Sequence, residues 1–233
     1  MRLNKFLAKA GIASRRKSDE LIQMATTMVN GKVCLDPAYH VKKEDSVQFD
    51  GKKVMVEKKK IVLMLHKPKK VITTVRDTHG RKTVMDFIPS KFRITPVGRL
   101  DQNTTGLLLL TNDGDLQEYL THPKNKVSKD YEVYIEGKLN IDQVKKLKSG
   151  LYIGYKEYGK AEILEQKVHK GRSKIILRMR QGKKREIRRI FHRLNKKLIS
   201  LKRIGFASLK LGNLREGEYR ELTHNEINKL CSL

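Results

Sequence analysis

Apolar residues recur along the chain first at helical spacing and then at the spacing of strands. Between residues 3 and 10 they repeat every third or fourth position and stop at Gly11, which predicts a short helix. Ser14 is a favourable N-cap for a second helix just after it. β-prone residues then surround an Asn-Gly pair in residues 28–33 and an Asp-Gly pair in residues 46–51, and both patterns predict hairpins.

Beyond residue 60 the pattern changes to short β-like runs with occasional helices. Residues 61–65 and 106–110 are apolar runs of strand length, and residues 131–135 alternate between the two faces of a strand. Helical spacing returns in residues 141–150 and 187–194. This mixture predicts an α+β fold with a central mixed, largely antiparallel sheet.

A lysine-rich stretch marks a boundary between these two regions. Lysines flank a short apolar triplet between residues 51 and 60. The length of the chain allows one large domain or two modest ones, and this change of composition favours two. We therefore expect a small N-terminal domain over residues 1–57 and a larger domain over residues 61–233.

The charge of the chain indicates the class of partner. The 52 Lys and Arg residues exceed the 25 Asp and Glu residues, giving a formal net charge of +27 and a pI of about 10.1. Such an excess predicts a polyanionic partner, and nucleic acid fits better than a membrane surface because no lipidation signal or long apolar run is present. The stretch 178–210 carries 13 of these cations and one acidic residue, so several of its side chains are expected to contact phosphate.

One carboxylate is a candidate reactive group. Asp101 lies in a polar loop, residues 98–104, directly ahead of the apolar run 106–110, which fixes its backbone and leaves its tip open. Taken alone, the pattern also fits an aspartate that caps a turn, the commoner role of a loop aspartate. Asp113 and Asp115 are assigned to an Asn-Asp-Gly turn and to helix capping, respectively.

Two further residues extend the candidate chemistry. Arg188 belongs to a basic helical segment, and it is either part of an RNA-gripping face or an inward-pointing partner that keeps a carboxylate ionised. Tyr131 begins a strand and is either a core aromatic or a platform on which an extruded base stacks. These two possibilities stay open for each residue when it is considered alone.

No metal or nucleotide cofactor is expected from the motifs. Residues 154–161 approach the spacing of a phosphate-binding P-loop, but Ala161 lacks the hydroxyl that would hold magnesium. The seven histidines show no metal-binding spacing. Cys34 and Cys231 lie too far apart in sequence to suggest a zinc motif, and they fit a chain kept in a reducing cytoplasm.

The N-terminal region resembles the S4 RNA-binding domain. The matching segments are residues 2–7, 11–16 and 29–33, which cover nearly the whole module. Helix N-termini and arginines both attract phosphates, so Arg15 and Arg16 at the start of the second helix are well placed to bind RNA phosphates. The alternative is that both arginines form an ordinary solvated helix face.

The whole chain resembles the RsuA/RluB family of bacterial rRNA pseudouridine synthases, in which an S4 domain precedes the catalytic domain. The most specific match is Gly98-Arg99-Leu100-Asp101 followed by residues 105–116. Supporting matches occur at residues 66–68, 129–131, 185–189 and 209–222. This resemblance implies an enzyme that converts uridine to pseudouridine without a cofactor.

The resemblance also assigns catalytic roles. Asp101 would be the essential carboxylate that breaks the bond between uracil N1 and ribose, either by attack on C1′ or through a glycal. Tyr131 would stack on the base, and Arg188 would form an ion pair with Asp101. Carboxylates perform comparable steps in other glycosyl-transfer enzymes.

Ten basic residues are expected to contact RNA. Arg99 either fills the gap left by an extruded nucleotide or holds neighbouring phosphates, and Lys67 is an RNA or a packing contact. The predicted contacts are Arg2, Lys5, Arg15, Arg16, Lys32, Lys67, Arg99, Lys184, Arg185 and Arg189.

The expected substrate is ribosomal RNA, free or in a ribosome assembly intermediate. The segments 120–123 and 185–189 resemble the large-subunit members of the family more than the small-subunit members, which implies 23S rather than 16S rRNA. We expect a cytoplasmic monomer with no membrane association. The alternative is a ribosome-binding protein without catalytic activity, which explains the charge but gives no reason for Asp101, Tyr131 and Arg188 to occur together.

Overall fold

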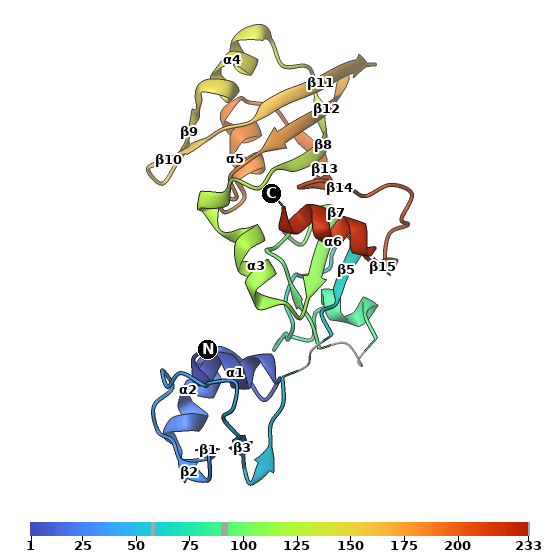
Figure 1. Ribbon diagram of the computed structural model, residues 1–233. Coiled ribbons are helices and arrows are strands. Elements are labelled where there is room, and N and C mark those ends of the chain that lie inside the picture. Colours follow the sequence, from blue (N-terminus) through green and yellow to red (C-terminus); the bar gives the residue numbers. More distant parts are fainter. Residues whose placement is uncertain (57–58, 90–92, 233) are drawn as a thin grey trace. The chain divides into compact units, whose positions relative to one another are not determined.

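The computed structural model describes residues 1–56, 59–89 and 93–232 (Figure 1). By its internal contacts the chain divides into two compact units, Met1–Lys60 and Ile61–Leu233. Among the described residues, every helix is too short or too polar to cross a membrane.

The first unit contains two helices and a four-stranded antiparallel sheet in the order β2-β1-β3-β4. Its core contains Leu3, Leu7 and Ile22 from the helices and Val29 and Val47 from the strands. The elements are α1 Leu3–Lys9, α2 Arg15–Gln23, β1 Thr27–Val29, β2 Lys32–Val33, β3 Val47–Phe49 and β4 Lys52–Lys53.

The local signals in this unit act as predicted. The Ser14 hydroxyl accepts a hydrogen bond from the amide of Lys17 and caps α2. Asn30 and Gly31, with φ of 53° and 77°, form the turn between β1 and β2. The pair at 50 and 51 repeats this geometry between β3 and β4, so left-handed turns suited to hairpins set both registers.

The second unit is built on a mixed sheet of nine described strands. Seven form the order β11-β12-β8-β13-β7-β5-β15, while β14 pairs with β13 and β6 with β7. All of these pairs are antiparallel except β7 with β13, which confirms the predicted α+β fold. The strands are β5 Val62–Lys67, β6 Thr95–Pro96, β7 Thr105–Thr111, β8 Lys129–Glu136, β11 Glu162–His169, β12 Arg172–Met179, β13 Leu198–Phe206, β14 Leu209–Lys210 and β15 Tyr219–Glu221.

Helices and a separate hairpin complete this unit. The segment 154–161, considered above as a P-loop, instead belongs to the β9–β10 hairpin and the chain that follows it. These elements are α3 Gly114–Thr121, α4 Ile141–Ser149, α5 Glu186–Arg193, α6 His224–Cys231, the 3₁₀ helices η1 Val84–Phe87 and η2 Pro123–Asn125, and the strands β9 Leu151–Gly154 and β10 Glu157–Gly159.

One capping assignment is wrong. The N-cap of α3 is Asp113, whose carboxylate accepts hydrogen bonds from the amides of Asp115 and Leu116. Asp115 is the second residue of α3, where its negative charge interacts favourably with the positive end of the helix dipole.

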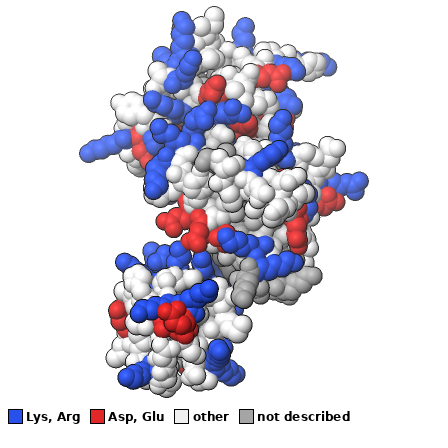
Figure 2. All heavy atoms as spheres, viewed as in Figure 1, with Lys and Arg blue, Asp and Glu red and all other residues white. Residues whose placement is uncertain are grey.

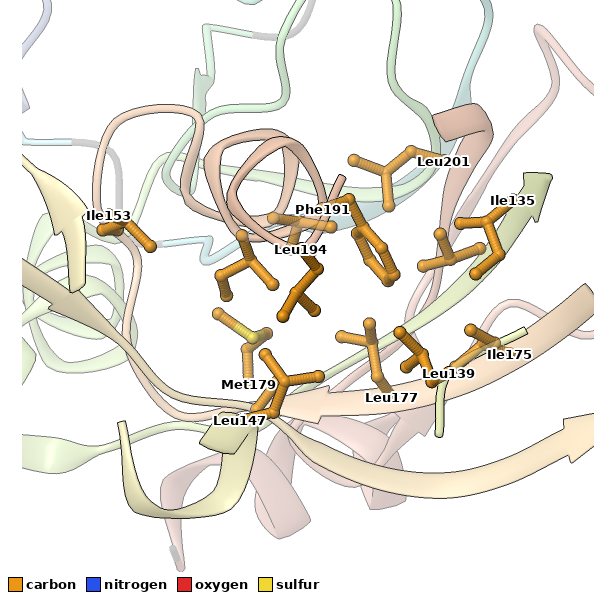
Figure 3. Close-up of a cluster of buried hydrophobic side chains, with 14 residues drawn as sticks. Ile135, Leu139, Leu147, Ile153, Ile175, Leu177, Met179, Phe191, Leu194 and Leu201 are labelled. Carbon is orange, nitrogen blue, oxygen red and sulfur yellow. The ribbon is translucent and has the colours of Figure 1, made fainter. Parts of the chain in front are cut away.

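Three apolar clusters form the core of the second unit. One lies between α5 and strands β8, β12 and β13, where Phe191 and Leu194 face Leu177 (Figure 3). The other two clusters lie on opposite faces of β5 and β7. On β7, Leu107 and Leu109 belong to one cluster, and Leu108 and Leu110 belong to the other. Burial on both faces explains why residues 106–110 are uninterrupted by polar positions.

Gly106 permits the single parallel pairing of the sheet. Its φ is 108°, and a Cβ built at this position would lie 2.2 Å from the carbonyl oxygen of Arg203 on β13. Only glycine allows this close approach. The approach fixes the start of β7, and with it the end of the loop that carries Asp101.

Candidate active site

The loop of residues 98–104, here called the aspartate loop, is anchored on both sides of Asp101. The Thr73 hydroxyl donates to the carbonyl of Leu100, and the amide of Lys70 donates to the carbonyl of Gln102. Within the loop, the amide of Thr104 donates to the carbonyl of Asp101. The side chain of Asp101 is 37% exposed, so a fixed backbone presents an accessible carboxylate.

A buried lysine provides a further anchor. Lys67 ends β5 and is fully buried, and its Nζ donates to the carbonyls of Pro68 at 2.8 Å, Thr104 at 2.9 Å and Gln102 at 3.3 Å. Burial lowers the pKa of Lys67 to about 8, although the nearby Asp101 opposes this shift. The prediction that Lys67 contacts RNA is therefore corrected, because all of its side chain lies inside the protein.

Two arginines at the start of α5 face Asp101. The Nε of Arg188 lies 3.6 Å from Oδ2 of Asp101, and Nη1 of Arg185 lies 3.9 Å from the same atom. Arg188 also donates from Nη2 to the carbonyl of Asn103 and to the hydroxyl of Thr104. Arg188 thus contacts both the carboxylate and the backbone that carries it.

The surroundings of Arg188 include opposing influences on its charge. Burial lowers its pKa and the neighbouring Arg185 lowers it further, whereas Asp101 raises it. An arginine stays charged despite such shifts because its ordinary pKa lies above 12. The cation therefore offsets the negative charge of the partly exposed Asp101 carboxylate.

Tyr131 lies on β8 and packs against two of the three core clusters. Its strand alternates as predicted, with Val133 and Ile135 buried and Tyr134 exposed. Tyr131 is itself only partly buried. It is therefore both a core aromatic and a surface-accessible ring.

A cavity of about 1090 Å³ is lined by Asp101, Tyr131 and Arg188 together. The three side chains come from the aspartate loop, β8 and α5, and they lie far apart in sequence. A space of this size accommodates a nucleotide. A carboxylate, an aromatic ring and a cation therefore meet at one cavity.

Lys129 and Arg203 also line this cavity and were not identified from the sequence as functional. Lys129 lies two residues before Tyr131 on β8, so strand alternation alone places it on the same face. Burial and the nearby Arg203 lower the pKa of Lys129 to about 8. Arg203 is 2% exposed and pairs opposite Tyr131 from β13, a position that only the sheet register reveals.

The other predicted RNA contacts have different environments. Most donors of the Arg189 guanidinium form hydrogen bonds within the protein. They donate to the carboxylate of Glu157 at 2.6 Å and to the carbonyls of Ile153 and Gly154. This arginine therefore braces the β9–β10 hairpin while its side chain stays partly exposed. Lys5 is partly buried, and the exposed ones are Arg2, Arg15, Arg16, Lys32, Arg99, Lys184 and Arg185.

Positive charge is distributed widely over both units. Lys and Arg side chains are spread across the visible face of each unit and do not gather in one patch (Figure 2). Asp and Glu side chains are fewer in the same view. This distribution suits contacts with a long polyanion.

Comparisons with known proteins agree with these observations. Residues 61–193 match the family model described as RNA pseudouridylate synthase, and residues 1–47 match the S4 domain. Ribosomal large subunit pseudouridine synthase B of Bacillus subtilis is 40% identical, with 100% of this chain and 96% of that protein covered. An uncharacterized RNA pseudouridine synthase of Aquifex aeolicus is 37% identical over 99% of this chain and 93% of its own length.

A solved structure supports the same assignment. The crystal structure of a pseudouridylate synthase aligns with a TM-score of 0.70 at 26% identity, covering 99% of each chain. Each family model matches the larger part of one unit, and Asp101, Tyr131 and Arg188 of the candidate cavity lie within the range of the synthase model. The chain therefore belongs to the RNA pseudouridylate synthase family and carries an S4 domain ahead of its catalytic domain.

Proposed function

We propose that this protein isomerises a uridine of ribosomal RNA to pseudouridine, and that 23S rRNA is its substrate in preference to 16S rRNA. The observation that carries the proposal is the meeting of Asp101, Tyr131 and Arg188 at one cavity of a pseudouridylate synthase domain. The name of the Bacillus subtilis relative, a large-subunit enzyme, supports the choice of 23S rRNA.

In this proposal Asp101 is the catalytic carboxylate. It either attacks C1′ of the ribose as the bond to uracil N1 breaks, or removes a ribose proton to give a glycal. The uracil then turns within the cavity and its C5 bonds to C1′, which displaces the Asp101 carboxylate on the first route and is accompanied by return of the proton to the ribose on the glycal route. C5 then loses its proton and N1 gains one. Arg188 keeps Asp101 charged and oriented, and the ring of Tyr131 stacks on the base and is the candidate group to move the C5 proton.

In this proposal the protein's own side chains carry out the reaction, and substrate and product are isomers. The conversion involves no net oxidation or reduction, and no group passes to a second substrate. The activation free energy is lowered by the positioning of the nucleotide against Asp101 and by the charged groups near C1′. The S4 unit and the basic surface would supply the affinity for RNA.

The alternative is a ribosome-binding protein without catalytic activity, and tritium release separates the two. Purified protein is mixed with 23S and 16S transcripts labelled with tritium at uridine C5, and release into water is measured. We expect release from 23S rRNA at a stoichiometry near one per molecule. RNA binding without release from either transcript would favour the alternative.

The cellular target is tested separately. Pseudouridines are mapped in rRNA from cells with and without the gene, and in precursor particles isolated from both. We expect one position in 23S rRNA to lose its pseudouridine. Loss from 16S rRNA instead would overturn the choice of subunit, and the precursor in which the modification first appears identifies whether free rRNA or an assembly intermediate is the substrate.

The remaining expectations concern the state of the protein. We infer that it acts as a monomer in the cytoplasm, where ribosomes are assembled, because one chain supplies all three candidate catalytic residues. Sedimentation at micromolar concentration tests the first point. A dimer at these concentrations would contradict it.

A further inference from the structure

A second cavity of about 440 Å³ lies beside the first. It is formed by residues 72–81 together with residues 99–102 of the aspartate loop. Arg99, Leu100 and Asp101 line both cavities. The aspartate loop is therefore a wall common to the two spaces, with the candidate catalytic carboxylate on that wall.

The opposite wall of this second cavity is held in place by its own contacts. The carboxylate of Asp77 accepts hydrogen bonds from the amides of His79 and Arg81 and from the guanidinium of Arg81. These bonds hold the pKa of Asp77 well below its usual range. The side chain of Asp77 is only 7% exposed, so the turn is closed before any ligand binds.

The charges of the second cavity favour an anion. Asp77 is neutralised by Arg81 at 2.7 Å, and Asp101 faces Arg185 and Arg188. Arg76 and Arg99 are exposed, and neither guanidinium forms a hydrogen bond or ion pair within residues 1–56, 59–89 and 93–232. Two cations without counter-ions at one concave site suit a phosphate group.

We propose that this cavity is a subsite for the RNA backbone next to the target uridine, with Arg76 and Arg99 contacting a flanking phosphodiester. The inference rests on the proposed function, because it places the extruded uridine at Asp101. An extruded nucleotide stays joined to its neighbours through its own phosphates, so the backbone must leave the first cavity close to the wall that both share. The subsite would fix the position of the ribose relative to Asp101.

The test couples one arginine to one phosphate. The probes are three synthetic RNAs spanning the uridine identified by mapping, one unmodified and two with a single neutral methylphosphonate, 5′ or 3′ of that uridine. Dissociation constants are measured for the wild type, Arg76→Gln and Arg172→Gln, and pseudouridine formation on the unmodified RNA is followed in parallel. Arg172 is an exposed arginine at the start of β12 and serves as the matched control.

We expect one methylphosphonate to weaken binding by the wild type about tenfold, as the loss of a charged contact to phosphate does. Arg76→Gln should weaken binding of the unmodified RNA severalfold and reduce the sensitivity to that methylphosphonate, because only Arg99 remains to contact the phosphate. Arg172→Gln should keep this sensitivity.

Two contrary results are distinguishable. If the wild type modifies the unmodified RNA but Arg76→Gln responds to both methylphosphonates as the wild type does, the subsite is refuted and the proposed function stands. If the wild type modifies no uridine in rRNA, the proposed function fails and the subsite fails with it.

Discussion

Lys67→Met tests whether the buried lysine holds the aspartate loop or contacts RNA. The substitution keeps much of the side-chain volume and removes three hydrogen bonds to backbone carbonyls, at 2.8, 2.9 and 3.3 Å. Hydrogen bonds from a charged donor contribute about 1.5–3 kcal/mol each, or roughly 5–9 kcal/mol together. The loop carbonyls of Gln102 and Thr104 would lose this donor.

Part of that loss is offset by removal of a buried charge. The pKa of Lys67 is lowered from 10.5 to about 8, which corresponds to about 3 kcal/mol spent on keeping the ammonium charged. We therefore expect Lys67→Met to reduce the free energy of unfolding by about 2–6 kcal/mol. Urea denaturation followed by circular dichroism measures this change.

The kinetic consequence separates the two roles. A loosened aspartate loop misplaces Asp101, so kcat for tritium release should fall about 100-fold while the dissociation constant for RNA changes less than twofold. Lys69→Met is the control, because Lys69 is exposed in the same segment and should affect only RNA binding. A Lys67→Met protein that binds RNA weakly but retains its kcat would refute the positioning role.

Three other predictions follow from the same geometry. Arg188→Gln should lower kcat by about 100–1000-fold. Arg188→Lys should recover part of this activity, because lysine restores the positive charge but not the planar guanidinium. Equal rates for the two variants in single-turnover assays would argue against an ion pair. Gly106→Ala should lower the free energy of unfolding by about 3–5 kcal/mol, because the added Cβ would lie 2.2 Å from the carbonyl oxygen of Arg203. An unchanged midpoint of urea denaturation would contradict the close approach of β7 and β13 at this glycine. Lys67 and Lys129 have pKa values lowered to about 8, so the unfolded chain binds more protons above that pH and their contribution to stability rises from about pH 8 to 10.5. The kcat of the folded enzyme should instead fall around pH 8, where Lys67 loses its proton in the folded state, and a kcat that does not change there would exclude this.

Local signals in the sequence predicted most of the fold. Ser14 capped its helix, and the Asn-Gly and Asp-Gly pairs set two hairpins, because these effects involve only neighbouring residues. The apolar run 106–110 predicted a buried strand for the same reason. The parallel pairing of β7 with β13 could not be predicted, since it depends on how the backbone at Gly106 meets a strand almost 100 residues later.

The candidate site was predictable only in part. Asp101, Tyr131 and Arg188 were identified through family motifs, and the structure brings them to one cavity. Burial was the feature that the sequence did not reveal, so Lys67 was predicted to contact RNA although its ammonium is buried and donates to backbone carbonyls. A lysine after four apolar residues and a histidine was the available signal for Lys67, because a strand buried on both faces has no exposed position for it.

The central claim is that one carboxylate, at residue 101, performs the isomerisation, and Asp101→Asn tests it most directly. Asparagine keeps the shape of the side chain and removes its charge and nucleophilicity. The control is Asp142→Asn, an exposed carboxylate in the first turn of α4. We predict that Asp101→Asn binds 23S rRNA with the wild-type dissociation constant and releases no tritium from uridine C5, while Asp142→Asn releases it at the wild-type rate. Release by folded Asp101→Asn at a rate near that of the wild type would contradict the account.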